Sequence, residues 1–462
     1  MKKALSLILT IILVLSLCAC GGSGNNEEKK PEGLQVGFGK VDITPTASLG
    51  ALGLGGYGDN DSRLYEGIFS KVYITCVAMS ENGNTVLLYT MDSQCCSEGM
   101  TNQLRAKVSP ETGVAKENIF CGATHTHSAP APAQYAQYYE YWLKAGVQAA
   151  KDALADLASA TILSAEPEIE GMNFVRHYIM SDGSYAGSNF GSFKKTPFQG
   201  HAAEGDHRMT LVKFDRPEGK EDVLLVNWSA HADHGNKIGR YNLSADYPGF
   251  LRDKIEADTG MKVAYFTGAS GNMNPDSKIP EETHNLDVKA YGEKLADLAI
   301  AALPTLKPVE GSGIKVNTGT VKVNINHDWD DKLKEAEEIN STKNAEYARL
   351  LCEKYGFSSD LHAYAVIRRS KLAAAHDQSV HAFSVGGIGF INCDYEMFSK
   401  NGMYVKENSP FATTFIVTGN NSYIASEDAY EYGSYEAHIG NFEKGTAEKL
   451  AEKFVELLRA LS

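Results

Sequence analysis

The stretch Asn118-Ile-Phe-Cys-Gly-Ala-Thr-His-Thr-His-Ser-Ala-Pro130 joins a short apolar run to two histidines and a proline. The apolar run predicts a strand, and the Pro-Ala-Pro that follows cannot continue a ladder of backbone hydrogen bonds. We therefore predict a strand that ends near residue 124 and presents His125 and His127. Side chains two positions apart on an extended chain point to the same face. Two such imidazoles could bind a metal or move a proton, or could lie in a loop without chemical function.

The rest of the chain repeats this arrangement of apolar strands that end in polar clusters. Paired β-branched and aromatic runs predict hairpins at residues 72–91, 209–228 and 380–393. Helices are expected at 135–158, 248–258, 287–302 and 442–461. The predicted fold class is α/β, with mixed β-sheets flanked by helices in one large catalytic domain at residues 36–462. Within it, residues 329–375 are predicted to be a charged helical insertion, a solvated scaffold rather than a lid that faces a membrane.

Composition excludes some functions. The 462 residues carry a net charge of −14, whereas a nucleic-acid surface needs a basic patch, so no nucleic-acid partner is expected. The same charge disfavours electrostatic adhesion to anionic lipid. Residues 53–58 read Gly-x-Gly-x-x-Gly, formally a dinucleotide-binding fingerprint, but no strand leads into them and no helix follows. We predict a loop beside a ligand or a plain surface loop.

The N-terminus has the pattern of an export signal. A basic start precedes an apolar run at residues 4–17, too short for a membrane span. Leu17-Cys18-Ala19-Cys20 resembles a bacterial lipoprotein lipobox, which predicts a signal peptide at residues 1–19 and a lipidated Cys20. Residues 20–35 would be a flexible tether. The expected location is extracytoplasmic, anchored to the bacterial membrane by this lipid; the alternative is an ordinary secretory peptide that contains cysteines.

The polar clusters at the predicted strand ends together offer the ligands of a catalytic metal site. They contain the pair His125 and His127, the pair His231 and His234, residues 270–274, Glu396 and Tyr423. Ligands of α/β folds collect at the carboxyl ends of strands. Two imidazoles and a carboxylate are a common set for catalytic zinc, and a phenolate could add a fourth ligand. Spacing alone does not show that these residues converge.

Five motifs carry a family resemblance. They are Gly37-Phe-Gly-Lys-Val-Asp-Ile-Thr-Pro45, Ala123-Thr-His-Thr-His-Ser-Ala-Pro130, Asn227-Trp-Ser-Ala-His231, Asp394-Tyr-Glu-Met397, and Tyr423-Ile with Tyr435-Glu. In this order, spread over residues 36–462, they resemble the catalytic domain of the neutral/alkaline (non-lysosomal) ceramidase family. That family cleaves the amide bond of N-acylsphingosines to a fatty acid and a sphingoid base, with a zinc-activated water as the attacking group. The resemblance implies a ceramide-like amphipathic amide as substrate.

The resemblance also implies residue roles. His125, His231, Glu396 and Tyr423 would bind one Zn²⁺. His127 would face the substrate amide as an acid/base or as a donor to the transition state. The resemblance further places Arg176 near the reacting carbonyl and makes Tyr435 a second hydrogen-bonding group there.

Two departures from the family pattern leave the substrate open. Asn274 stands where the family has a catalytic serine, and an amide can neither attack a carbonyl nor shuttle a proton. The family's C-terminal β-sandwich domain is not expected within this sequence. The alternatives are therefore a zinc hydrolase of a non-lipid amide or ester, and a non-catalytic surface lipoprotein that binds a ligand.

Some of the assigned roles also have alternatives. His234 could replace His231 as the ligand, and Arg176 could only pair a surface carboxylate. Asp92, Asp233 and Asp246 could orient imidazoles, or could cap turns and helices.

Overall fold

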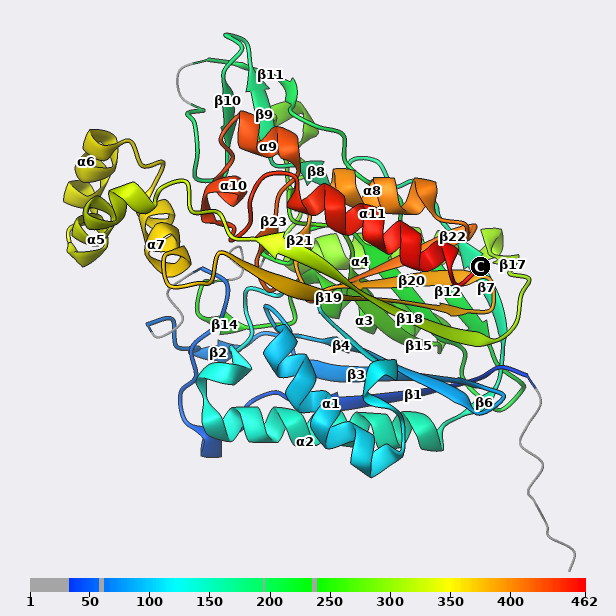
Figure 1. Ribbon diagram of the computed structural model, residues 1–462. Helices are drawn as coiled ribbons and strands as arrows, with labels where there is room; N and C mark the ends of the chain where they lie inside the picture. Colours follow the sequence, from blue (N-terminus) through cyan, green and yellow to red (C-terminus); the bar gives the residue numbers. More distant parts are fainter. Residues whose placement is uncertain (1–32, 58–61, 194–195, 235–238) are drawn as a thin grey trace, which may run out of the picture. The chain divides into compact units, whose positions relative to one another are not determined.

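Three β-sheets meet around one apolar core in the computed structural model (Figure 1), which describes residues 33–57, 62–193, 196–234 and 239–462. Residues 33–462 form one unit. The predicted signal peptide, Cys20 and most of the predicted tether lie outside the described residues, as does Gly58 of the glycine-rich loop. No helix among the described residues is both long enough and apolar enough to span a membrane.

Each large sheet is mixed, with one parallel pair at an end. In spatial order, the first sheet contains β5 (Ile119–Ala123), β4 (Asn84–Met91), β3 (Tyr73–Glu81), β1 (Gln35–Asp42) and β6 (Ala158–Ser159). The second contains β15 (Lys262–Thr267), β13 (Val223–Trp228), β12 (Thr210–Asp215), β7 (Thr161–Ala165) and β17 (Lys307–Pro308). The third contains β18 (Ile314–Asn324), β19 (Ala375–Val385), β20 (Ile388–Cys393) and β22 (Thr413–Thr418). The parallel pairs are β4 with β5, β13 with β15, and β20 with β22.

The inner faces of the three sheets share one core. Phe120 of the first sheet stacks on Phe383 of the third, with ring centroids 4.3 Å apart. Phe266 of the second sheet packs edge-on against Phe415 of the third at 5.4 Å. Such aromatic pairs bury large apolar areas and fix the relative position of the sheets.

The outer face of each sheet is covered by two helices, as the alternation of strand and helix patterns predicts. The first sheet carries α1 (Glu98–Thr112) and α2 (Ala136–Ala155), the second carries α3 (Asp246–Thr259) and α4 (Val288–Ala302), and the third carries α8 (Ser399–Asn408) and α11 (Thr446–Arg459). Gly37 and Gly39 of β1 let α2 approach closely, because a Cβ at either would lie 2.0–2.1 Å from a carbonyl oxygen of α2.

A separate helical segment extends from this frame (Figure 1, yellow). It contains α5 (Leu333–Ser341), α6 (Ala345–Tyr355) and α7 (Asp360–Arg369), which share a small apolar cluster of their own. Asn344 and Ser359 cap the starts of α6 and α7 by accepting from backbone N–H groups. The three helices lie within the insertion predicted at 329–375.

Candidate metal centre and active site

The carboxyl ends of the parallel strands meet at one place and supply the candidate ligands. His125 follows β5, and His231 follows β13. Glu396 starts the short strand β21 (Glu396–Met397) after β20, and Tyr423 starts β23 (Tyr423–Ile424) after β22. The two short strands pair in parallel with Glu396 opposite Tyr423, which places the carboxylate beside the phenol. All four residues come from different elements, and the topology of the three sheets brings them together.

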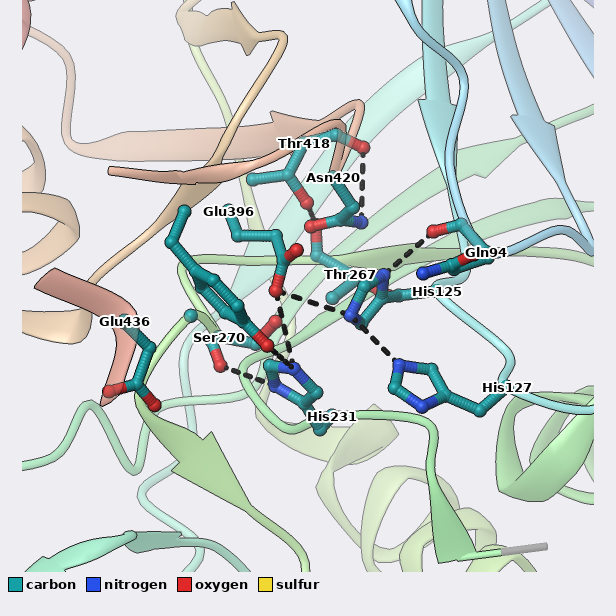
Figure 2. Close-up of polar contacts among 12 residues, drawn as sticks. Gln94, His125, His127, His231, Thr267, Ser270, Glu396, Thr418, Asn420 and Glu436 are labelled. Atoms are coloured by element: carbon teal, nitrogen blue, oxygen red, sulfur yellow. Dashed lines mark hydrogen bonds and ion pairs between the residues drawn. The ribbon is translucent and has the colours of Figure 1, made fainter. Parts of the chain in front are cut away.

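The side chains converge on one carboxylate oxygen (Figure 2). The Nε2 atoms of His125 and His231 each lie 3.3 Å from Oε2 of Glu396. The hydroxyl of Tyr423 lies 3.4 Å from Nε2 of His231. The structure thus brings together all four residues that the sequence suggested as ligands.

The two histidines are oriented by backbone carbonyls. Nδ1 of His125 lies 2.7 Å from the carbonyl oxygen of Gln94, and Nδ1 of His231 lies 2.8 Å from that of Ser270. A carbonyl only accepts, so each Nδ1 carries a proton and each Nε2 turns toward Glu396. Oε2 of Glu396 is buried without a hydrogen-bond donor among the described residues.

This arrangement fits a bound cation. Two nitrogen lone pairs and an anionic oxygen would repel one another, so positive charge is needed between them, either protons on the imidazoles or a metal ion. Without a metal, protons on the imidazoles supply that charge: burial alone would raise the pKa of Glu396, but His125 and His231 lower it to about 2, and Glu396 in turn raises the pKa of His125 against the effect of burial. Two imidazoles, a carboxylate and a phenol make a donor set that suits Zn²⁺.

His127 lies next to the cluster but is held differently. Its Nε2 is 3.2 Å from Nε2 of His125, and one nitrogen from each of His125, His127 and His231 lies within 4.8 Å of the others. Its Nδ1 finds no hydrogen-bond partner in the described parts of the chain. Burial, together with the adjacent His125 and His231, lowers the pKa of His127 well below its ordinary value. The ring is therefore neutral, and it lacks the carbonyl that anchors the other two.

The prediction that both histidines extend from one strand was wrong in its geometry. Strand β5 ends at Ala123, and His125 has a φ of 63°, in the left-handed region. Its ring meets that of His127 edge-on, with centroids 4.8 Å apart. A turn therefore brings the imidazoles together, and a left-handed non-glycine backbone is strained.

The glycine-rich loop lies against His127. Gly56 has a φ of 121°, and a Cβ there would come within 2.4 Å of the His127 ring. The described part of this loop therefore lies beside the histidine cluster, while the prediction of a loop beside a ligand stays a prediction. No side chain other than hydrogen would leave room for the imidazole at this point.

Arg176 is the centre of a buried polar network. Its Nε donates to Oε1 of Glu436 at 2.7 Å, and its Nη2 donates to the Tyr423 hydroxyl at 3.1 Å. Burial alone lowers the pKa of Arg176, but Tyr423 and Glu436 outweigh this effect and raise it. Nε2 of His177 lies 2.8 Å from the other oxygen of Glu436. Glu436 is fully buried, so the alternative that Arg176 pairs only a surface carboxylate was wrong.

Asn274 and Tyr435 lie beside this network. Nη1 of Arg176 donates to Oδ1 of Asn274 at 3.3 Å, so this side-chain amide helps to hold the guanidinium. The Tyr435 ring lies edge-on to that of Tyr423, with centroids 6.1 Å apart. Burial raises the pKa of Tyr435 to about 12, so its hydroxyl is a neutral donor.

Two other residues singled out in the sequence have hydrogen-bond or ion-pair partners outside the cluster. Nε2 of His234 lies 3.0 Å from the Leu286 carbonyl oxygen, and its ring stacks on Tyr291. Asp92 pairs with Arg252 at 3.0 Å.

The two remaining aspartates also have contacts of their own. Asp246 is the first residue of α3 and accepts from the Tyr247 backbone N–H at 2.7 Å. The Asp233 carbonyl oxygen accepts from the Tyr57 hydroxyl at 3.2 Å.

A cavity of about 220 Å³ opens onto the cluster. Its wall contains His125, His127, Glu396, Tyr423 and Tyr435, together with residues of α7, among them Tyr364 and Arg368. Neither α7 nor Glu436 was identified from the sequence as part of the site. Two features of the sequence could have pointed to them. The helical pattern of α7 has one face that could border a site, and Glu436 directly follows Tyr435, which was already assigned to the site.

Comparisons with known proteins agree with this fold. The family model described as neutral/alkaline non-lysosomal ceramidase, N-terminal, matches residues 34–274. The crystal structure of a neutral ceramidase from Pseudomonas aeruginosa aligns with a TM-score of 0.66 at 16% identity, covering 94% of this chain and 75% of that one. A structure described as ceramidase complexed with C2 aligns with a TM-score of 0.65 at 16% identity, covering 93% and 75%. No curated protein matches the sequence. The predicted fold class is thereby confirmed.

Proposed function

Because the chain belongs to the neutral/alkaline non-lysosomal ceramidase family and is a ceramidase-like hydrolase, we propose that it cleaves the amide bond of an N-acylsphingosine-like lipid in a zinc-dependent reaction. The products are a fatty acid and the amine. The observation that carries the zinc dependence is the pair of carbonyl-anchored imidazoles that face Oε2 of Glu396 at 3.3 Å.

The proposed ligands are Nε2 of His125 and His231, Oε2 of Glu396 and the hydroxyl of Tyr423. A bound Zn²⁺ supplies two effects here: it polarises the substrate carbonyl and lowers the pKa of a water molecule. The carbonyls of Gln94 and Ser270 keep the two imidazoles in the tautomer that presents Nε2.

His127 is the proposed proton carrier. It is neutral, it borders the cavity, and its Nδ1 has no competing partner among the described residues. A neutral imidazole can accept a proton from the attacking water and return it to the leaving nitrogen. The lack of a carbonyl anchor distinguishes His127 from the two proposed ligands.

Arg176 and Tyr435 are the proposed donors to the oxyanion. Glu436 and Asn274 fix the guanidinium of Arg176 from two sides. Donors held in place before the reaction stabilise charge that develops in the transition state. Asn274 acts through this positioning.

Anchoring through Cys20 is part of the proposal, because a lipid substrate lies in a membrane. Replacing Cys20 with Ala should abolish the incorporation of labelled fatty acid into the protein and release it from the membrane fraction. Continued labelling of Cys20→Ala would contradict lipidation at this residue.

The central test combines zinc content with turnover. We expect about one zinc per chain and chelator-sensitive release of fatty acid from short-chain and long-chain ceramides. His125→Ala should lose both, whereas His234→Ala is the matched control that should keep both. Two outcomes would contradict the proposal and favour a ligand-binding function. One is a wild-type protein that contains no zinc, and the other is a turnover that is the same in wild type and His125→Ala.

One observation favours a second candidate function. Asn274 replaces the family's serine and is hydrogen-bonded to Arg176, so the reacting centre differs from that of the family. A zinc hydrolase of a non-lipid amide would show chelator-sensitive cleavage of simple N-acyl amides and no turnover of ceramide.

A further inference from the structure

One face of helix α7 forms part of the cavity wall. Leu361, Tyr364, Ala365 and Arg368 border the same cavity as the proposed zinc ligands. Their spacing of three, one and three residues places them on one side of a helix. The position of this face is fixed by Arg369, whose Nη1 donates to the carbonyls of His438 and Gly440.

Arg368 is a cation in this wall without an anionic partner. Its Nη2 donates to the Ile439 carbonyl oxygen at 2.6 Å, and its Nε is buried without an acceptor. No carboxylate of the described residues forms an ion pair with it. The buried Arg176 and Arg252 each pair with a carboxylate, whereas Arg369, which does not line the cavity, also donates to backbone carbonyls. Burial also lowers the pKa of Arg368, as expected for a guanidinium that has lost water without gaining an anion.

Arg368 lines the same small cavity as the proposed zinc ligands, so it lies near an amide that reacts there. At about 30 Å³ per water molecule, a cavity of about 220 Å³ holds roughly seven waters. Typical ligand pockets are about 300–1,000 Å³, so this cavity holds the amide and its nearest substituents, and longer chains of a substrate would extend beyond its open mouth. Tyr435 lies close enough to the guanidinium to influence its pKa, and Tyr435 packs on Tyr423 at the proposed zinc site.

We propose that this cavity selects an amide substrate that carries an anionic group, a carboxylate or a phosphate, and that Arg368 binds this group. The proposal rests on the amide hydrolysis proposed above and specifies its substrate class. A guanidinium presents N–H donors that match carboxylate and phosphate oxygens. A neutral ceramide offers no group of this kind.

The test compares matched substrates on the zinc-loaded protein. One pair is a short-chain ceramide and its 1-phosphate; the other is an N-acyl amino acid and its methyl ester. We expect the anionic member of at least one pair to have a kcat/KM roughly tenfold or more above its neutral match, as charge-assisted hydrogen bonds imply. The pair that shows the preference identifies phosphate or carboxylate as the group.

Variants assign the preference to Arg368. Arg368→Gln should bring the ratio of the two kcat/KM values close to one, and Arg368→Lys should keep most of it. Arg349→Gln removes one positive charge from the exposed surface of α6 and is the matched control, which should keep the wild-type ratio. If Arg368→Gln does not fold, two other measurements provide the test. One is the ratio of kcat/KM values for the anionic and neutral substrates in Arg368→Lys, and the other is the fall of the same ratio in wild type as salt is added. An equal preference in wild type and Arg368→Gln would overturn the proposal.

The two proposals fail in different ways. If no amide is cleaved, the proposed hydrolysis fails, and calorimetric binding of the same pairs tests Arg368 alone. The other outcome is that the protein shows no preference within either pair, so that ceramide matches its phosphate and the N-acyl amino acid matches its ester. In that case the hydrolysis stands and the role of Arg368 fails.

Discussion

At the scale of single residues, the site is defined by how each imidazole is held. His125 and His231 are both fixed through Nδ1 by backbone carbonyls, while His127 has no such anchor. The left-handed backbone of His125 shows that the surrounding structure imposes this placement against a local energetic cost of roughly 1–3 kcal/mol.

This difference predicts distinct effects of two substitutions. His231→Ala should lose zinc and activity together, because it removes a ligand. His127→Ala should keep zinc and lower kcat by about 10²–10⁴-fold, the usual effect of losing an acid/base group. Metal analysis and steady-state kinetics on the same preparations measure both. Loss of zinc in His127→Ala would instead make His127 a ligand.

The buried pair of Arg176 and Glu436 predicts a large effect on stability. Glu436→Gln leaves the guanidinium buried without its anion, which typically costs about 3–5 kcal/mol. The control is Glu111→Gln, since Glu111 pairs with Lys151 on the surface, and exposed pairs contribute about 0–1 kcal/mol. Urea unfolding of both variants measures the difference. Similar losses in the two variants would mean that Arg176 finds another partner.

Sequence reasoning identified the residue types of the site but not their geometry. The motifs pointed to His125, His231, Glu396 and Tyr423, which the structure brings together, yet the extended-strand argument for His125 was wrong. A left-handed turn at a histidine has no local sequence signature, because it depends on contacts made by the rest of the fold. Glu436 was missed because its burial depends on Arg176, which is distant in the sequence.

At the scale of elements, helix α7 joins the inserted helical segment to the site. One of its faces borders the cavity, while His362 on another face stacks on His438 with ring centroids 4.4 Å apart. Sequence patterns predicted helices in this segment, but not that one of them borders the cavity. Periodicity gives the face of a helix, and only tertiary structure shows what that face meets.

His362 predicts a pH-dependent stability of this segment. Burial first, then His438, Arg369 and Lys332, lower its pKa to about 3, against about 6.5 in an unfolded chain. The rings of Trp329 and Phe357 and the Ser358 hydroxyl also face it. The neutral ring therefore contributes to the free energy of unfolding. This contribution is fully present above pH 6.5, decreases as the pH falls below 6.5, and is lost by about pH 3.

We expect the difference in free energy of unfolding between wild type and His362→Gln to become smaller as the pH is lowered. His362→Gln lacks the titration, so the difference in free energy of unfolding between wild type and variant should shrink from pH 7 to pH 4. Urea unfolding at several pH values measures it, with His376→Gln on the exposed edge of β19 as the control. A difference that stays constant over this range would show that His362 is protonated equally in both states.

At the scale of the whole molecule, the described residues form three sheets around one core, and each sheet is followed by at least one proposed zinc ligand. The α/β class, the hairpins and most helices could be predicted from hydrophobic periodicity, because those patterns are local. That β5, β13 and the β20–β22 pair end at one point could not be predicted, since sheet packing depends on contacts between distant segments.

This arrangement predicts that the metal stabilises all three sheets together. Zinc at 100 times its Kd should raise the free energy of unfolding by about 2.7 kcal/mol, seen as one thermal transition that moves upward with zinc concentration. His231→Ala should not respond to the same zinc. Two separate transitions, only one of them sensitive to zinc, would show that the sheets unfold independently.

The spread of the ligands along the chain also has a consequence for synthesis. The chain emerges with His125 first, then His231, and only much later Glu396 and Tyr423. A nascent chain interrupted before its last sheet has two histidines and no carboxylate to complete the set. If the proposed zinc site is correct, tight metal uptake reports that translation has passed Tyr423 and that the sheets have docked, so zinc retention would test for completely folded chains.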